Sequence, residues 1–377
     1  MIQRATSMPQ AMTVVAALLE PLDDPHVFFL PPGYKHPLVV YGFRFMMVGN
    51  DCYVTEIDPG SDAAKKLYLG ERLLSVEGEP LTRENFWKVD YNLKVLSPRD
   101  LLHIGIEETD EPTGNAAGDK TGRNRGGDPD TGEGEVIVQA RIRTQTDGPG
   151  AGGVHDQEAG PYSSRRAEFS KEGVLIWKIP RFPLESDDAV AKWKLTKAYK
   201  ALVLDLRGTD GEWDRGDDSM LGNLLGKDTQ VGSRITRKGS EPYIVKAEKI
   251  PFRGELVVLV DSGTSGSAEI LARVMQIEKR GVVIGDRTAG AATESKVFSC
   301  ATGEEPELEA AHVSISVAEI RMADGQTIGK EGVAPDDVVL PSQDDLKAGR
   351  DPQLARAAEL AGLAIDAKAA GKIFPPD

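Results

Sequence analysis

The stretch that decides the fold is Gly254–Ala292, which reads GELVVLVDSGTSGSAEILARVMQIEKRGVVIGDRTAGAA. Residues 256–260 form an apolar run that is rich in β-branched side chains and too short to span a membrane. Such a run predicts a strand whose two faces are both buried. Residues 261–267 are turn and cap formers, so the strand should end in a hydroxyl-rich turn.

A helix and a second strand follow this turn. Ile270, Val274 and Ile277 recur on one stripe, which predicts an amphipathic helix, and the apolar run 282–284 predicts another buried strand. This order of elements is typical of α/β folds with a largely parallel sheet. Hydroxyls and backbone N–H groups at the helix N-terminus could stabilise an oxyanion, but Ser and Thr are equally ordinary helix caps. The local pattern leaves both interpretations open.

The composition narrows the class of protein. The chain has 377 residues, 40% of them hydrophobic and 28% charged, which is ordinary for a protein with packed cores. A formal charge of −15 argues against nucleic acid or an anionic membrane surface as partner. Two distant cysteines and five scattered histidines give no disulfide framework and no zinc spacing. We therefore expect no metal, no cofactor and no membrane span.

The chain divides into four parts, of which three precede the α/β core. Residues 1–37 predict a small N-terminal helical segment, with a buried helix in the apolar run 12–19 and an extended exit at the prolines that follow. Residues 38–108 predict a β-rich domain of short strands and turns. Residues 109–165 predict an acidic, glycine-rich linker that contains one strand.

Residues 166–377 predict the α/β core itself. The runs 173–179 and 201–208 predict buried strands, with a helix over 186–199 between them. A last helix should begin after Asp351, since a proline occupies its first turn. Strand–helix–strand connections of this kind imply right-handed crossovers between parallel strands.

The order of strands and turns in residues 38–108 resembles a PDZ domain. In that family a glycine-containing loop binds the C-terminal carboxylate of a peptide, and an edge strand accepts the peptide by β-addition. The resemblance implies that Tyr41, Gly42 and Phe43 bind peptide. The alternative is a small β-rich packing domain without a ligand.

Five motifs in this order resemble the C-terminal processing (tail-specific) serine peptidases. The resemblance implies a crotonase-like ββα peptidase core with an inserted PDZ-like domain. It also implies a serine nucleophile with a lysine base, or a serine with histidine and glutamate as in tricorn-like relatives. Polypeptide substrates or protein C-termini would be the partners, in a periplasmic or secreted location, although no convincing signal peptide is present. The motifs are residues 23–32, 204–208, 264–270, 285–288 and 332–336.

The sequence departs from the family pattern at the nucleophile. The family places its serine three residues before a glutamate, and three residues before Glu269 stands Gly266. The nearest hydroxyls belong to Ser267 and Ser265, so these two are the candidate nucleophiles. Ser267 is favoured because it lies in the first turn of the predicted helix.

The base is also changed. The lysine that the family carries after its Gly-x-x-Thr turn corresponds to Ala291. Lys296 lies five residues further on, and in an extended strand this odd offset turns it to the opposite face. Glu331 is a candidate orienting acid, or a solvated loop carboxylate.

The resemblance places the oxyanion donors at Gly208 and Ala268. Asp210 follows Gly208 closely and would bring a negative charge near a developing oxyanion. Two hypotheses remain: a serine peptidase of weakened activity, and an inactive homologue that acts as a peptide- or protein-binding module. The sequence leaves catalytic competence, substrate identity and oligomeric state open.

Overall fold

The computed structural model describes much of the chain in two compact units, and each unit is presented by itself. The first comprises Met1–His36, Ala151–Pro341 and Gly349–Asp377, and the second comprises Pro37–Gly150 and Ser342–Ala348. The described residues are 14–15, 18–31, 39–107, 126–128, 133–142, 167–179, 182, 196, 198–211, 218–249, 251–300 and 311–374.

The centre of the first unit is a sheet with the strand order β11-β12-β13-β16-β17-β20. The pairs from β12 through β20 are parallel, and β11 is antiparallel to β12. All five residues of β12 and of β13 are buried, as continuous apolar runs require. The strands are β11 (Ala167–Lys171), β12 (Val174–Lys178), β13 (Ala201–Asp205), β16 (Glu255–Val260), β17 (Val282–Gly285) and β20 (Asp337–Val338).

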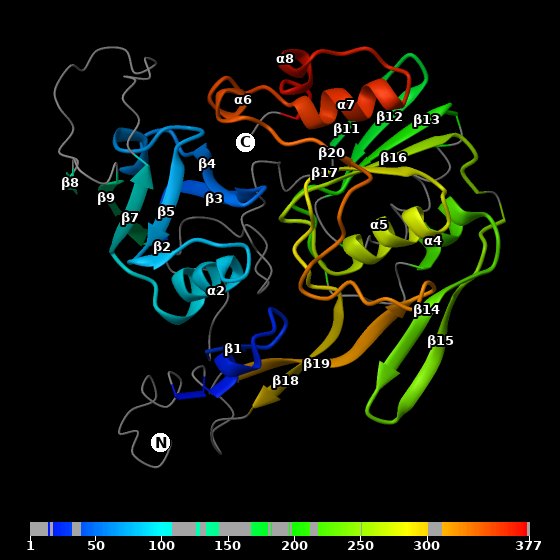
Figure 1. The fold of residues 1–377 in the computed structure, drawn as a ribbon, viewed down its shortest axis with the longest axis horizontal. Helices are drawn as coiled ribbons and strands as arrows, with labels where there is room; N and C mark the ends of the chain where they lie inside the picture. Colours follow the sequence, from blue (N-terminus) through cyan, green and yellow to red (C-terminus); the bar gives the residue numbers. More distant parts are fainter. Residues whose placement is uncertain are drawn as a thin grey trace. The chain divides into compact units, whose positions relative to one another are not determined.

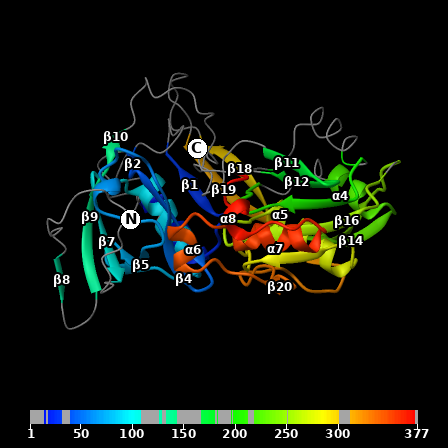
Figure 2. The same ribbon diagram turned by 90° about the horizontal axis from the view of Figure 1, so that it is seen from above.

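Helices cover both faces of this sheet. Leu202 and Leu204 of β13 share a core with α5 (Ser267–Ile277) and α4 (Asp218–Leu225). Val203, on the other face, shares a second core with α7 (Pro352–Leu360), beside which lies α8 (Ala367–Ala370). Figure 1 shows α7 and α5 on either side of the strands, and in Figure 2 they therefore overlap.

The predicted strand–turn–helix–strand unit is confirmed as β16, α5 and β17. Ile270 and Val274 of α5 are each 1% exposed, and Ile277 is partly buried and packs against the same core, so the predicted stripe faces the core. The Asp351 side chain accepts the backbone N–H of Leu354 and caps α7, as expected. The helix predicted over 186–199 lies largely outside the described residues.

A second sheet in the first unit has the strand order β1-β19-β14-β15, and β18 pairs with β19. β1 comes from the proline-flanked N-terminal peptide, which is extended as predicted. Residues 14–15 and 18–19 are helical, but Leu18 is 59% exposed, so the expected burial of this helix does not hold there. The strands are β1 (Phe28–Leu30), β14 (Thr229–Thr236), β15 (Gly239–Val245), β18 (Thr293–Cys300) and β19 (Ala311–Met322).

The second unit is built on a sheet with the order β3-β4-β5-β7-β9-β8, and β6 pairs with β5. A short helix α2 (Phe86–Tyr91), the pair β2 (Val39–Val40) and β10 (Arg141–Ile142), and α6 (Gln343–Lys347) complete it. The strands are β3 (Phe43–Val48), β4 (Asp51–Ile57), β5 (Arg72–Val76), β6 (Glu79–Pro80), β7 (Leu101–Glu107), β8 (Gly126–Asp128) and β9 (Glu133–Gln139).

The strand expected inside the acidic segment is β9, and it belongs to this sheet. β9 pairs with β7 along its whole length. Val136 and Val138 are 5% and 0% exposed and lie in the core of the unit, while Ile137 faces outward. This part of residues 109–165 is therefore a structural strand of the second unit rather than a linker.

Among the helices that the structure describes, none is long and apolar enough to cross a membrane.

Candidate active site

The turn between β16 and α5 contains Gly266, the residue at the position where the resemblance places a nucleophile. Gly266 caps α5 with φ 60° and ψ −125°, a conformation that side-chain-bearing residues rarely adopt. A sharp turn from strand to helix is how several hydrolases expose a catalytic serine. A Cβ atom on Gly266 would lie 1.9 Å from the carbonyl oxygen of Gly211. The backbone of another loop therefore fills the space that a nucleophile would need.

We name residues 208–211 the covering loop. Ser265 donates its N–H to the carbonyl of Thr209 at 2.9 Å, and Ser267 donates its N–H to the carbonyl of Gly211 at 3.2 Å. On the other side of the loop, Phe182 donates its N–H to the Asp210 carbonyl at 2.9 Å. The covering loop is thus fixed against the turn by backbone hydrogen bonds.

Both predicted oxyanion donors already donate hydrogen bonds to acceptors within the chain. The N–H of Gly208 donates to Oδ1 of Asp261 at 2.8 Å, and the N–H of Ala268 donates to the Ser265 carbonyl at 3.3 Å. Gly266 itself donates to the Ala291 carbonyl at 3.0 Å. An oxyanion would have to displace these internal acceptors before it could bind here.

The predicted catalytic side chains differ in their surroundings. Ser267 is 4% exposed, whereas Ser265 is partly exposed. The Glu331 side chain is 89% exposed and pairs with Arg287 at 3.1 Å. Lys296 is exposed on β18. Catalytic roles for Ser267, Ser265 and Glu331 stay predictions.

Glu269 ties the turn to the following loop. Its carboxylate accepts the hydroxyl of Thr288 at 2.5 Å and the N–H groups of Gly290 and Ala291 at 2.7 Å each. The Gly266 N–H also approaches it at 3.2 Å. Burial raises the pKa of this carboxyl to about 7, against the lowering effect of its donors.

This raised pKa predicts a pH dependence of stability. The folded state retains a proton on Glu269 between about pH 4.5 and 7 that the unfolded state releases. Its contribution is therefore present below about pH 4.5 and is lost as pH rises through about 7. We expect the stability of wild type relative to Glu269→Gln to fall by up to about 3 kcal/mol over this range, since one pKa unit is about 1.4 kcal/mol. Urea unfolding of both proteins from pH 4.5 to 8 measures this, and a pH-independent difference would contradict it.

His26 lies next to the candidate site, although the sequence did not single it out. Its Nε2 lies 2.6 Å from the carbonyl oxygen of Ala291, which also accepts the Gly266 N–H. The histidine thus stands beside the position where the family carries its lysine. Residues 26 and 291 are 265 positions apart, so only the fold brings them together. The one signal was that His26 lies within the motif 23–32.

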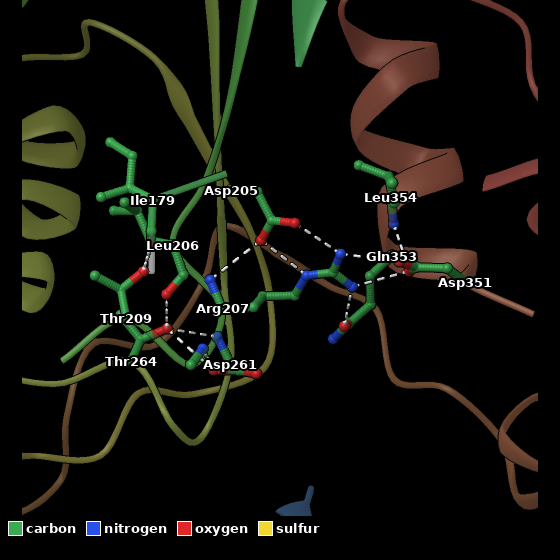
Figure 3. A network of polar contacts seen from close by, with 11 residues as sticks. Ile179, Asp205, Leu206, Arg207, Thr209, Asp261, Thr264, Asp351, Gln353 and Leu354 are labelled. Atoms are coloured by element: carbon green, nitrogen blue, oxygen red, sulfur yellow. Dashed lines mark hydrogen bonds and ion pairs between the residues drawn. The ribbon is translucent and has the colours of Figure 1, made fainter. Parts of the chain in front are cut away.

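A buried ionic network lies at the carboxyl ends of the parallel strands (Figure 3). Arg207 makes two hydrogen bonds of 2.9 Å to the Asp205 carboxylate and two of 2.9 Å to Asp351. It thereby links the end of β13 to the cap of α7. Lys178 is fully buried nearby, and burial lowers its pKa to about 7 despite the charge of Asp205. The cluster thus joins the central sheet to α7 through buried charges.

The predicted peptide-binding residues lie at the start of β3 in the second unit. The Tyr41 hydroxyl accepts the N–H of Arg99 at 3.1 Å, and the Gly42 carbonyl accepts the N–H of Asp58 at 2.9 Å. Phe43 is 8% exposed and opens β3, which is the end strand of its sheet. Across the described part of the chain, no group of three or more His, Cys, Asp or Glu could hold a metal ion.

Phe45 connects this strand to helix α2. Its ring stacks on Phe43 at 5.6 Å and meets Phe86 of α2 edge-on at 5.6 Å. The end strand and the helix thus border one aromatic cluster.

Comparison with known proteins shows which proteins this chain resembles in sequence. Residues 174–339 match the model of peptidase family S41. The chain is 30% identical over 140 residues to the carboxy-terminal processing protease CtpA of Bacillus subtilis, covering 37% of this chain and 28% of that protein. It is 28% identical over 137 residues to a carboxyl-terminal-processing protease of Synechocystis, covering 36% and 30%. The matches thus span less than a third of these two relatives.

Solved structures have a similar fold. A photosystem II D1 C-terminal processing protease has a TM-score of 0.53 at 18% identity, covering 97% of this chain and 89% of that one. Mature CPAF complexed with lactacystin has a TM-score of 0.59 at 13% identity, covering 92% and 87%.

The family model and the solved structures therefore show what this chain is similar to in sequence and in fold. Residues 174–339 are similar to the peptidase family S41 model, and the resemblance to the C-terminal processing peptidases is confirmed.

Proposed function

We propose that this protein is a polypeptide-binding member of the C-terminal processing peptidases in which cleavage is lost. The observation that carries this proposal is Gly266, a glycine where the family carries its nucleophile, with the Gly211 carbonyl in the space of the missing side chain. Ala291 in place of the lysine and the engaged N–H donors point the same way. A lost general base alone costs roughly 10²–10⁴-fold in rate.

In this proposal the second unit is a PDZ-like module that binds peptide, and the first unit is a crotonase-like core. An extended peptide would add to β3, the end strand of its sheet, with its C-terminal carboxylate at the Gly42 loop. The aromatic cluster of Phe43, Phe45 and Phe86 would receive a peptide side chain. Protein C-termini are accordingly the proposed ligands.

We expect the full chain to bind fluorescent peptides with a free C-terminus more tightly than their amidated forms, by about tenfold or more, because the amide removes a charge-assisted contact. Phe45→Ala should weaken this binding. Ile137→Ala is the matched control, since it removes an exposed apolar side chain from β9, away from β3 in the same sheet. Fluorescence anisotropy measures both, and equal affinity for free and amidated peptides would reject the PDZ-like assignment.

A weak peptidase is the second candidate, and His26 is the observation that favours it. The imidazole beside Ala291 could act as base where the lysine is absent, with Ser267 or Ser265 as nucleophile and Glu331 as orienting acid. Each of these roles would require the covering loop to move away from the turn.

Labelling with a fluorophosphonate distinguishes the two candidates. We expect no serine of the folded wild type to be labelled, and casein turnover to be absent. If the second candidate holds, labelling will appear at Ser267 or Ser265, and Ser267→Ala, Ser265→Ala or His26→Ala will abolish it. Robust casein cleavage that survives all three substitutions would reject this site altogether.

A further inference from the structure

We infer that a cavity in the first unit binds a lysine or arginine side chain of the polypeptide ligand. This inference rests on the proposed function, because it takes a polypeptide as the partner. The cavity holds about 200 Å³ and lies between the N-terminal peptide 22–26, the loop 290–293, the strand β19 and residues 327–330. Pockets for drug-sized ligands are larger, so its size suits one side chain rather than a cofactor.

Four of the apolar lining residues are buried, and we call them the floor of the cavity. Ala291, Ala292, Ile320 and Ile328 line it, and each is at most 8% exposed in the folded chain. An aliphatic stem of several methylene groups would gain from contact with such a surface. The floor therefore accepts the stem of a long side chain.

The charged lining residues, which we call the rim, are three carboxylates and one lysine. Lys330 pairs with Asp23, so these two charges offset each other. Asp24 accepts the His26 backbone N–H at 2.8 Å, which leaves its negative charge in place. Glu319 is exposed and forms no ion pair with any described residue. Two carboxylates, neither with a cationic partner among the described residues, thus line the cavity together with its apolar residues.

A cationic head on an aliphatic stem complements both features. Lysine and arginine bury their stems along apolar surface while the charged head stays near water and acceptors. Glu319 is held in register by Thr293 of β18 and Ile235 of β14, so its backbone position is fixed. We therefore name Asp24 and Glu319 as the residues that select a basic side chain.

The test uses the full chain with labelled isoleucine methyl groups, because Ile320 and Ile328 lie in the cavity floor. The probes are the acetylated and amidated pentapeptides Ala-Ala-Lys-Ala-Ala and Ala-Ala-norleucine-Ala-Ala, which lack a free C-terminus. We expect the lysine peptide to shift the Ile320 and Ile328 signals with about two- to fivefold higher affinity than the norleucine peptide, the range of a solvent-accessible ion pair. Glu319→Gln should remove this preference and leave norleucine binding within about twofold.

Glu248→Gln is the matched control, because Glu248 is an exposed carboxylate of the same unit outside the cavity. Equal shifts with both peptides, no response of Ile320 and Ile328, or equal effects of the two substitutions would overturn the inference. The proposed function has its own readout, the preference for free over amidated C-termini. A protein that shows this preference but no lysine response would lack the cavity site while it keeps the proposed function.

Discussion

Gly266→Ala is expected to destabilise the protein by about 3–5 kcal/mol, a large share of the roughly 5–15 kcal/mol that holds a domain folded. Two costs combine. A residue with a Cβ at φ 60° and ψ −125° is strained by about 1–3 kcal/mol. The new Cβ would also lie 1.9 Å from the Gly211 carbonyl oxygen, and relieving that overlap costs a further 1–3 kcal/mol or so.

Gly325→Ala separates these two costs. Gly325 also has a positive φ, 84°, but a Cβ there would meet nothing within 4 Å. We therefore expect it to cost only about 1 kcal/mol. Urea unfolding gives both values. If Gly266→Ala costs no more than Gly325→Ala, the covering loop does not occupy the space above the turn.

The closeness of the Gly211 carbonyl to Gly266 also limits any attempt to introduce catalysis by substitution. Gly266→Ser would install the family's hydroxyl, but its Cβ would meet the same carbonyl oxygen. The covering loop would have to shift before the serine could fit, and that shift would break the hydrogen bond from Ser267 to Gly211. We therefore expect Gly266→Ser with Ala291→Lys to recover little activity.

The parts of the fold that could be predicted are those encoded by contiguous sequence. The run 256–260 and the stripe of Ile270 and Val274 lie within single elements, so their periodicity reports burial directly. The sequence likewise shows Gly266 and Ala291 where the resemblance places a nucleophile and a base, because both stand at fixed offsets from recognisable motifs.

The parts that could not be predicted depend on contacts between distant segments. The covering loop meets the turn through the backbone of Gly211, and a carbonyl contact leaves no mark in residue type. His26 reaches Ala291 across 265 positions, so no spacing rule applies. β9 was seen as a strand, but its partner β7 lies beyond a long acidic segment, and alternation does not say which strand it joins.

Arg207→Met is expected to cost about 3–5 kcal/mol, because it would leave buried carboxylates without their cation. Asp205 is fully buried and Asp351 is 16% exposed, and each receives two guanidinium hydrogen bonds. Burial raises the pKa of Asp205, but the charge of the Arg207 guanidinium outweighs it with its neighbours and holds that pKa below its usual range. Without it, both the end of β13 and the cap of α7 lose their common partner.

Two further variants show whether the unpaired charge is the cause. Arg273→Met removes an arginine whose pair with Asp324 is 28% exposed on both sides, and should cost about 1 kcal/mol or less. Asp205→Asn combined with Arg207→Met removes the buried charge together with its partner, so it should recover part of the loss. Urea midpoints for the three proteins decide the matter. Equal losses for Arg207→Met and Arg273→Met, or no recovery in the double variant, would show that the network of Figure 3 does not stabilise the core through its charges.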